Sequence, residues 1–172
     1  MDYTVIETDR LILRRLGQDD YEALCEIMQD DETMTAYEGP FSDEEVHEWL
    51  DRRISQYEKW GFSLWAVILK ESGKLIGQCG LTMQKWKDSE VLEIGYLFNR
   101  KYWHRGYASE AARACKEYAF GVLGADEVCS IIRDSNAPSI GVALRNGMDP
   151  KDHIVKHYRG VDMPHTRYAV RR

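Results

Sequence analysis

The feature that most constrains this chain is a strand-like segment that leads through a glycine-containing turn into a long helical segment. Residues 90–98 fit a strand, and residues 109–123 place alanines and larger apolar side chains on one helical face. Gly106 in the turn permits close approach of a ligand to the backbone. Free N–H groups at a helix start, reinforced by the helix dipole, form a ready anion site. Such a turn also occurs without any ligand, so the flanking residues must decide between the two interpretations.

The rest of the chain alternates strand and helix signals. The predicted strands are residues 10–16, 62–70, 75–83, 90–98, 128–133, 153–158 and 167–171, and the predicted helices begin near Asp19, Ser42, Ser109 and Pro138. Gly61 and Gly147 are natural ends for two of these helices. For 172 residues, this order predicts a single domain over residues 1–172 of the α/β (α+β) class, with helices on both faces of a mixed sheet.

Charge and composition narrow the class of protein. The formal net charge is −6, which makes nucleic acid a poor partner. No apolar run approaches the roughly 20 residues of a membrane helix, no secretory signal opens the chain, and the four cysteines form no CxxC pair. We therefore expect a cytoplasmic protein with no membrane partner, reduced core thiols and no metal site.

The acidic residues are concentrated in one part of the chain. Residues 17–58 contain 14 acidic side chains and two basic ones, whereas the remainder is mildly basic. Two interpretations remain open: a solvated helical surface, or an acidic rim that attracts a cationic acceptor. We expect the helices before and after residues 37–40, together with a loop at residues 163–166, to face the acceptor, although His165 is more typical of an ordinary surface histidine.

Four motifs follow one another along nearly the whole chain. They are Thr8-Asp9-Arg10-Leu11-Ile12-Leu13-Arg14, Glu93-Ile94-Gly95-Tyr96, Tyr102-Trp103-His104-Arg105-Gly106-Tyr107-Ala108 with Ser109-Glu110-Ala111, and Asn136 and Ser139 with Gly147-Met148. In order and spacing the chain resembles the GNAT superfamily of N-acetyltransferases, and most closely its branch typified by RimJ and RimL. The resemblance implies a single-domain GNAT fold with a mostly antiparallel sheet of six or seven strands, a central splay and four flanking helices. It also implies acetyl-CoA as cosubstrate.

The resemblance implies that the turn before the long helix holds the pyrophosphate of acetyl-CoA. The superfamily signature is Gln or Arg, two residues, Gly, one residue, then Gly or Ala. Trp103 stands in the place of the Gln or Arg, which removes a side-chain contact but leaves the backbone donors. Arg105 is expected to add charge, while Arg100 and Lys101 either meet other phosphates or are plain surface charges. The residues expected to bind the pyrophosphate are His104, Arg105, Gly106, Tyr107, Ala108 and Ser109.

The resemblance also implies that the pantetheine arm pairs with the splayed strand. Leu97 and Phe98 map onto that contact, and Asn99 follows them. Gly95, inside the strand, independently suggests a bulge or a close backbone approach. Asn136 maps onto a position whose amide contacts the arm, with a helix N-cap as the alternative role.

Acetyl transfer to an amine needs a base, an oxyanion donor and a proton for the leaving thiolate. Glu93 matches the family's usual carboxylate, and burial there would raise its pKa; a hydrogen-bonded structural glutamate is the alternative. A backbone N–H near Leu97 or Phe98 would meet the oxyanion. Many superfamily members place a tyrosine acid seven residues after the asparagine, where this chain has Ala143. Ser139 is therefore the candidate acid, with first-turn capping as the alternative.

Three functions remain to be separated. The first is an N-acetyltransferase whose acceptor is a primary amine, either a protein N-terminus or a small molecule, with a homodimer left open. The second is a catalytically degenerate CoA-binding sensor, because Trp103 and Ala143 depart from the usual pattern. The third is a nucleotide-binding module, but neither GxxxxGK[ST] nor GxGxxG occurs where such a module needs it.

Overall fold

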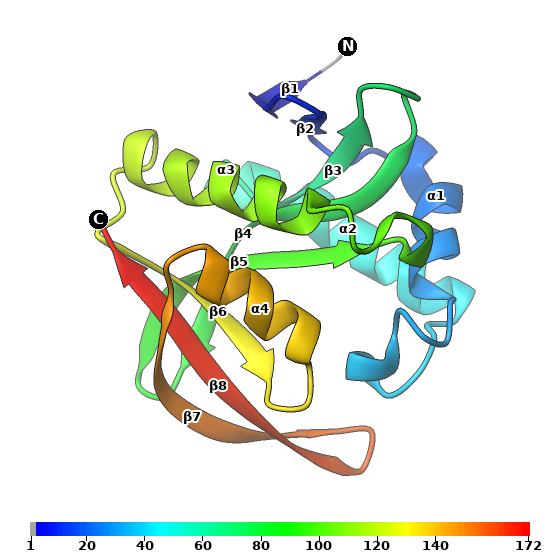
Figure 1. Ribbon diagram of the computed structural model, residues 1–172. Coiled ribbons are helices and arrows are strands. Elements are labelled where there is room, and N and C mark those ends of the chain that lie inside the picture. Colours follow the sequence, from blue (N-terminus) through cyan, green and yellow to red (C-terminus); the bar gives the residue numbers. More distant parts are fainter. Residues whose placement is uncertain (1–2) are drawn as a thin grey trace.

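The computed structural model describes residues 3–172 as one mixed sheet with helices on both faces (Figure 1). The strands are β1 (Thr4–Glu7), β2 (Leu11–Arg14), β3 (Leu64–Leu69), β4 (Leu75–Trp86), β5 (Ser89–Phe98), β6 (Glu127–Arg133), β7 (Asp149–Tyr158) and β8 (Val161–Arg171), and the helices are α1 (Tyr21–Met28), α2 (Asp43–Trp60), α3 (Tyr107–Gly121) and α4 (Ala137–Arg145). The predicted fold class and the four helices are confirmed. The eight described strands exceed the predicted six or seven, and residues 1 and 2 of the predicted domain lie outside the described residues.

The extra strand, β1, lies at one edge of the sheet. The strands follow the order β1-β2-β3-β4-β5-β6-β8-β7. β1 has four residues and pairs with β2 through a shift of register between Thr4 and Ile6. A strand this short and irregular shows no alternation that sequence reasoning can detect.

The last two strands both contain a proline, and both begin earlier in the chain than predicted. Pro150 lies in β7, an edge strand, where a missing N–H is tolerated. Pro164 lies in β8 just beyond the last pair of the β6 ladder, which joins Arg133 to His165. The prediction of a loop at residues 163–166 is therefore wrong, and His165 is a strand residue.

The helices divide between the two faces of the sheet, with α1 and α2 on one side and α3 and α4 on the other (Figure 1). On the first side, the Trp49 indole of α2 donates to Gln78 Oε1 of β4 at 2.8 Å. On the second side, Cys115 of α3 lies 3.7 Å, sulfur to sulfur, from Cys79, the next residue of β4. Adjacent strand residues thus face opposite layers, as the pleat requires. No helix within residues 3–172 is long and apolar enough to span a membrane.

The sheet splays between β5 and β6. Among the described strands, this pair alone runs parallel, and its register contains one residue pair, Glu93 with Cys129. Beyond it the two strands diverge (Figure 1). The β4–β5 register is unbroken, so the bulge suggested for Gly95 is absent from that side. A close approach is present instead, because a Cβ on Gly95 would lie 3.3 Å from Leu64 Cδ2.

Candidate active site

The turn before α3 exposes backbone at the start of a helix. Gly106 is the N-cap residue with φ of 79°, no side chain caps the helix there, and residues 104–106 are exposed. α3 begins at Tyr107, two residues before the predicted start. The Glu110 N–H donates to the Gly106 carbonyl, so the N–H groups of residues 107–109 precede the helical bonding pattern. The turn therefore has the backbone geometry that an anion site requires.

Arg10 supports this turn from the side. Its guanidinium donates to the Arg105 carbonyl at 2.9 Å and lies 4.4 Å from the centroid of the Tyr107 ring. Glu110 of α3 accepts from the Arg10 side chain at 2.7 Å and from Thr8 Oγ1 at 2.7 Å. The peptide before Gly106 is therefore fixed by residues nearly 100 positions away, a contact that no local sequence pattern reveals.

A second cation reaches the start of α3 from α4. Arg145 Nε donates to Ser109 Oγ at 3.0 Å. Arg145 is the basic residue in the last turn of α4, where a cation also suits the helix dipole. Sequence reasoning missed this residue, because only the fold brings the end of α4 to the start of α3.

The segment between β5 and the turn is held by its own side chains. The Trp103 indole donates to the Phe98 carbonyl at 2.9 Å, and Asn99 Oδ1 accepts from the Lys101 N–H at 3.0 Å. Arg100 pairs with Asp30 and Glu32, each at 3.0 Å. Of the two interpretations of Arg100, the geometry favours surface ion pairing over a role at the helix start.

Side chains, rather than backbone groups, span the splay. Ser130 Oγ donates to the Ile94 carbonyl at 2.8 Å, and the Ile131 N–H donates to Glu93 Oε2 at 2.8 Å. The Tyr96 hydroxyl donates to the carbonyl of Ser139, in the first turn of α4, at 2.8 Å. The first two bonds join β5 to β6, and the third joins β5 to α4, where the backbone ladder is open.

Only alternate residues of β5 direct their backbone N–H and carbonyl groups toward the splay. The Asn99 N–H donates to the Ile76 carbonyl in β4 at 2.8 Å, and the register then pairs Leu97 with Gln78. Since strand backbone groups point alternately to either side, Leu97 directs its N–H and carbonyl toward β4. Tyr96 and Phe98 direct theirs toward the splay. The geometry therefore favours Phe98 over Leu97 as the backbone donor at this edge.

Glu93 lies at the start of the splay and is partly exposed. Burial raises its pKa from 4.5 to about 7, opposed by the Ile131 N–H bond and by the charges of Lys156 and Arg53. Its partner across β4 is Thr82, so both side chains share the face that Trp49 contacts through Gln78. A carboxylate with this pKa can take up a proton near neutral pH.

The first turn of α4 contains the other predicted residues. Asn136 Oδ1 accepts from the Ser139 N–H at 3.4 Å, which is the N-cap role considered above. Ser139 is partly exposed, and its hydroxyl makes no hydrogen bond within the part of the chain that the structure describes. Ala143, at the position where the family resemblance implies a tyrosine, is buried. Tyr96 of β5 supplies a hydroxyl to this turn instead. Sequence reasoning passes over it, although strand alternation places Tyr96 on the opposite face from Gly95.

Three aromatic rings lie on the α2 side, near Glu93. Tyr37 packs edge to face against Phe41 and Trp49, with ring centroids 5.8 and 6.2 Å away. The pKa of Tyr37 is raised to about 12, mainly by burial and then by the charge of Glu93. Tyr37, between the two helices that are predicted to face the acceptor, thus lies near the candidate base.

The comparisons with known proteins agree with this geometry. The sequence profile of the acetyltransferase (GNAT) domain matches residues 10–149. The chain belongs to the GNAT acetyltransferase family. N-acetyltransferase p20 of Bacillus licheniformis is 32% identical over 155 residues, which cover 88% of this chain and 85% of the relative. The YkkB protein of Bacillus subtilis (strain 168) is 36% identical over 146 residues, which cover 84% of this chain and 85% of the relative.

Solved structures share the fold of this acetyltransferase. An acetyltransferase (GNAT family) from Bacillus anthracis superposes with a TM-score of 0.82 at 27% identity, covering 96% of this chain and 97% of that chain. RimL, a ribosomal L7/L12 alpha-N-protein acetyltransferase in complex with coenzyme A, superposes with a TM-score of 0.81 at 15% identity, covering 98% and 97%. At that identity the likeness to RimL shows the fold alone.

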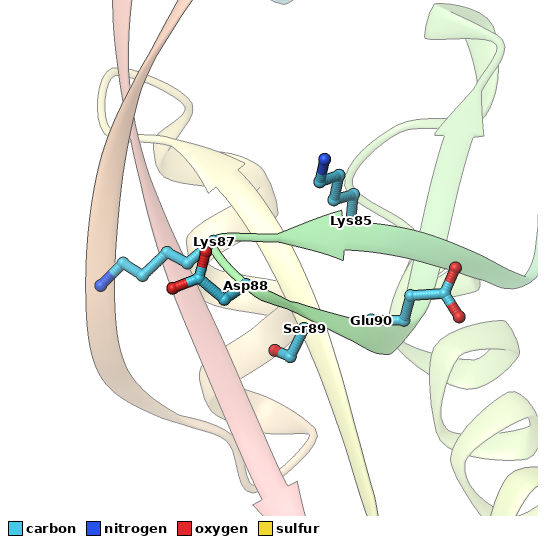
Figure 2. Close-up of a pocket in the computed structure, with 5 residues that line it drawn as sticks. All are labelled: Lys85, Lys87, Asp88, Ser89 and Glu90. Atoms are coloured by element: carbon cyan, nitrogen blue, oxygen red, sulfur yellow. The ribbon is translucent and has the colours of Figure 1, made fainter.

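Two hollows on the surface of this acetyltransferase lie at the β4–β5 hairpin and beside the start of the splay. One of about 530 Å³ surrounds the β4–β5 hairpin, where the side chains of Lys85, Lys87 and Glu90 point apart (Figure 2). Another, of about 130 Å³, lies between the first residues of β5 and β6. Within residues 3–172 no group of three or more His, Cys, Asp or Glu side chains could hold a metal ion.

Proposed function

We propose that this acetyltransferase uses acetyl-CoA to acetylate a primary amine, by direct attack of the amine on the thioester in a ternary complex. The observation that carries the proposal is the meeting of two features at one splay in the sheet. One is the uncapped start of α3, and the other is the carboxylate of Glu93 with its pKa raised to about 7. The first suits a diphosphate and the second suits proton removal from an amine.

The coenzyme would lie across α3 and along β5. The N–H groups of residues 104–109 would hold the pyrophosphate, with added charge from Arg105, and the arm would follow the open edge at Tyr96 and Phe98. Leu97, Asn99 and Asn136 remain proposed contacts of the arm. RimL, which has this fold, is in complex with coenzyme A, and this supports the choice of coenzyme.

The reaction needs only groups that the site contains. Glu93 removes a proton from the ammonium, whose ordinary pKa is about 10, and the free nitrogen attacks the thioester carbon. The developing oxyanion takes a hydrogen bond from the Phe98 N–H. Collapse of the intermediate breaks the C–S bond. The amide nitrogen gives up its second proton and the sulfur takes up one, relayed by the Ser139 hydroxyl or by water. Since a thiol has a pKa of about 8.5, the thiolate is a stable leaving group and needs no strong acid.

Two acceptor classes fit this chemistry, the N-terminus of a protein and a small-molecule amine. The likeness to RimL is one of fold and does not choose between them. A sensor that only binds coenzyme would have no use for a carboxylate with a raised pKa, so the geometry favours an enzyme.

The coenzyme is tested by thermal shift with acetyl-CoA, using ATP and NAD as controls. A ligand at 100 times its dissociation constant stabilises the folded state by about 2.7 kcal/mol. Gly106→Glu is expected to abolish the acetyl-CoA shift, because it places a charged side chain at the helix start, while circular dichroism shows an intact fold. An unchanged shift in this variant would contradict the proposed pyrophosphate site.

The reaction is tested by release of free thiol from acetyl-CoA with a panel of small amines and N-terminal peptides. We expect turnover with at least one amine and an acetylated product of matching mass. Acetyl-CoA binding without turnover across the whole panel would contradict the enzyme and favour the sensor.

A further inference from the structure

Arg53 of α2 is a buried cation that the proposed reaction does not use. It retains 6% of its surface exposed, and its guanidinium lies 4.2 Å from the centroid of the Trp49 ring. Nη1 donates to Gln56 Oε1 at 3.2 Å, whereas the buried Nε has no partner. Within residues 3–172 neither Nε nor Nη2 donates to any group, and no carboxylate lies within ion-pair distance. One edge of the guanidinium fork is therefore free.

A chain of hydrogen bonds anchors Arg53 to the sheet beside the splay. Gln56 Oε1 also accepts from Ser63 Oγ at 2.6 Å, and the Ser63 carbonyl accepts from the Leu81 N–H of β4 at 3.2 Å. Arg53 is thus fixed through two side chains and one backbone bond, so its position does not depend on a counter-ion.

The sheet at this point has two glycines on the α2 face, and Leu64 of β3 packs over them. Gly80, next to Leu81, lies opposite Gly95 of β5, and the following pair on the same face is Thr82 and Glu93. The charges of Arg53 and Glu93 act on one another, since Arg53 lowers the pKa of Glu93 and Glu93 raises that of Arg53. They nevertheless form no ion pair. A cation and an anion therefore lie near one another on the α2 side of the sheet without being paired.

A buried guanidinium without a counter-ion destabilises the fold, and an apolar side chain of similar volume would remove that cost. The chain keeps a charge here that packing does not require. Since Nε is closed to solvent, a carboxylate would satisfy the free edge through a charge-assisted N–H···O bond to Nη2.

We propose that the free edge of Arg53 binds the carboxylate of the acceptor while Glu93 receives its amine, so that the acceptor is a free amino acid or a similarly short amino-carboxylate. This inference rests on the proposed acetyl transfer and names its substrate class. The amine and carboxylate of one small zwitterion match the two separated charges of the site. The N-terminus of a protein would present a neutral amide to Arg53, and a polyamine would present a second cation.

The acidic residues near the site do not favour a cationic acceptor. Glu38 pairs with Arg133, and Glu45 pairs with Arg159. Asp30 and Glu32 are both bound to Arg100. Because these four carboxylates already have basic partners, this part of the acidic rim considered from the sequence is largely neutralised within the chain.

The test compares each of a set of amino acids with its carboxamide as acceptor for the wild type, Arg53→Met, Arg53→Lys and the control Arg52→Met. Arg52 is the next residue of α2 and is exposed. We expect the wild type and Arg52→Met to prefer the acid over the amide by about tenfold or more in kcat/KM. Arg53→Met is expected to lose the preference through KM for the acid, with KM for acetyl-CoA unchanged, and Arg53→Lys to retain part of it.

A second measurement does not depend on turnover. Isothermal titration of the wild type with N-acetyl amino acids and with their carboxamides reports the carboxylate subsite directly. We expect binding of at least one acid, weaker binding of its amide by about tenfold, and loss of this difference in Arg53→Met.

Three results would overturn the inference. Equal use or binding of acid and amide would remove the subsite, and so would turnover restricted to peptides or polyamines, although the acetyltransferase would then still stand. An upward shift of the pH profile in Arg53→Met that is equal for acid and amide would show that Arg53 only tunes Glu93. If no amine is acetylated, the titration still decides: binding that Arg53→Met loses supports the subsite, and no binding rejects it.

Discussion

At the scale of single residues, the raised pKa of Glu93 favours the proposed catalytic role over a structural one. A carboxylate kept only for its bond with the Ile131 N–H would be held ionised, with a lowered pKa. Burial instead raises the pKa to about 7 despite that bond. The ionised group therefore costs stability at neutral pH, which is typical of a residue retained for its chemistry.

The replacement Glu93→Gln should stabilise the protein at high pH. Because the folded pKa lies above the unfolded one, the contribution of Glu93 to stability is fully present below about pH 4.5 and is lost as the pH rises through 7. Glutamine does not titrate and can still accept from the Ile131 N–H. The free energy of unfolding of the variant, relative to the wild type, should increase by up to about 3 kcal/mol between pH 4.5 and pH 8. Urea titrations at several pH values measure this difference, and a constant difference would contradict the raised pKa.

The activity of the same variant provides the matching control. Wild-type turnover should rise with pH through about 7, because the base must be ionised. Glu93→Gln should lose that dependence and about 10²- to 10⁴-fold in rate, with the affinity for acetyl-CoA retained. Equal rates at every pH would remove Glu93 as the base.

At the scale of elements, α3 depends on a contact with the start of the chain. Arg10 binds the Arg105 carbonyl and Glu110, so it joins the turn to the first helical turn. Arg10→Met should loosen the peptide before Gly106 and raise KM for acetyl-CoA by about tenfold, with kcat at saturation nearly unchanged, as for loss of one charge-assisted bond.

Arg113→Met, on the exposed side of α3, is the control for a general effect of charge and is expected to behave as the wild type. A fall in kcat with no change in KM for Arg10→Met would mean that the contact does not act through coenzyme binding.

How much of these elements the sequence predicts depends on whether a signal is local. As predicted, α2 begins at the Ser42–Glu45 capping box and ends at Gly61, which has φ of 81°. The sequence does not predict β1, because four residues at a sheet edge show no detectable periodicity. It predicts too short a β8, because Pro164 is typical of a loop. The signal that predicts a helix start near Gly106 is likewise local. Tyr96 and Arg53 were not found, because their significance lies in contacts with distant elements.

At the scale of the whole molecule, the uneven charge of the chain becomes a set of internal contacts. The acidic stretch at residues 17–58 receives Arg100, Arg133 and Arg159 from the basic part of the chain. Arg159, in the hairpin between β7 and β8, also lies 5.5 Å from the centroid of the Phe41 ring. The ion pairs thus connect residues 30–45 with the ends of β5 and β6 and with the β7–β8 hairpin.

The pair of Glu45 and Arg159 should couple these two parts weakly but measurably. Both side chains are partly exposed, so the coupling free energy should be about 0.5 kcal/mol, and 1 M salt should abolish it. Glu45→Gln and Arg159→Met, singly and together, form a double-mutant cycle in urea denaturation; glutamine preserves the capping box with Ser42. Additive effects at low salt would show that the hairpin docks through its aromatic contacts alone. A coupling that persists in 1 M salt would mean that the pair is shielded from solvent, and that the acceptor side is more enclosed than these exposures indicate.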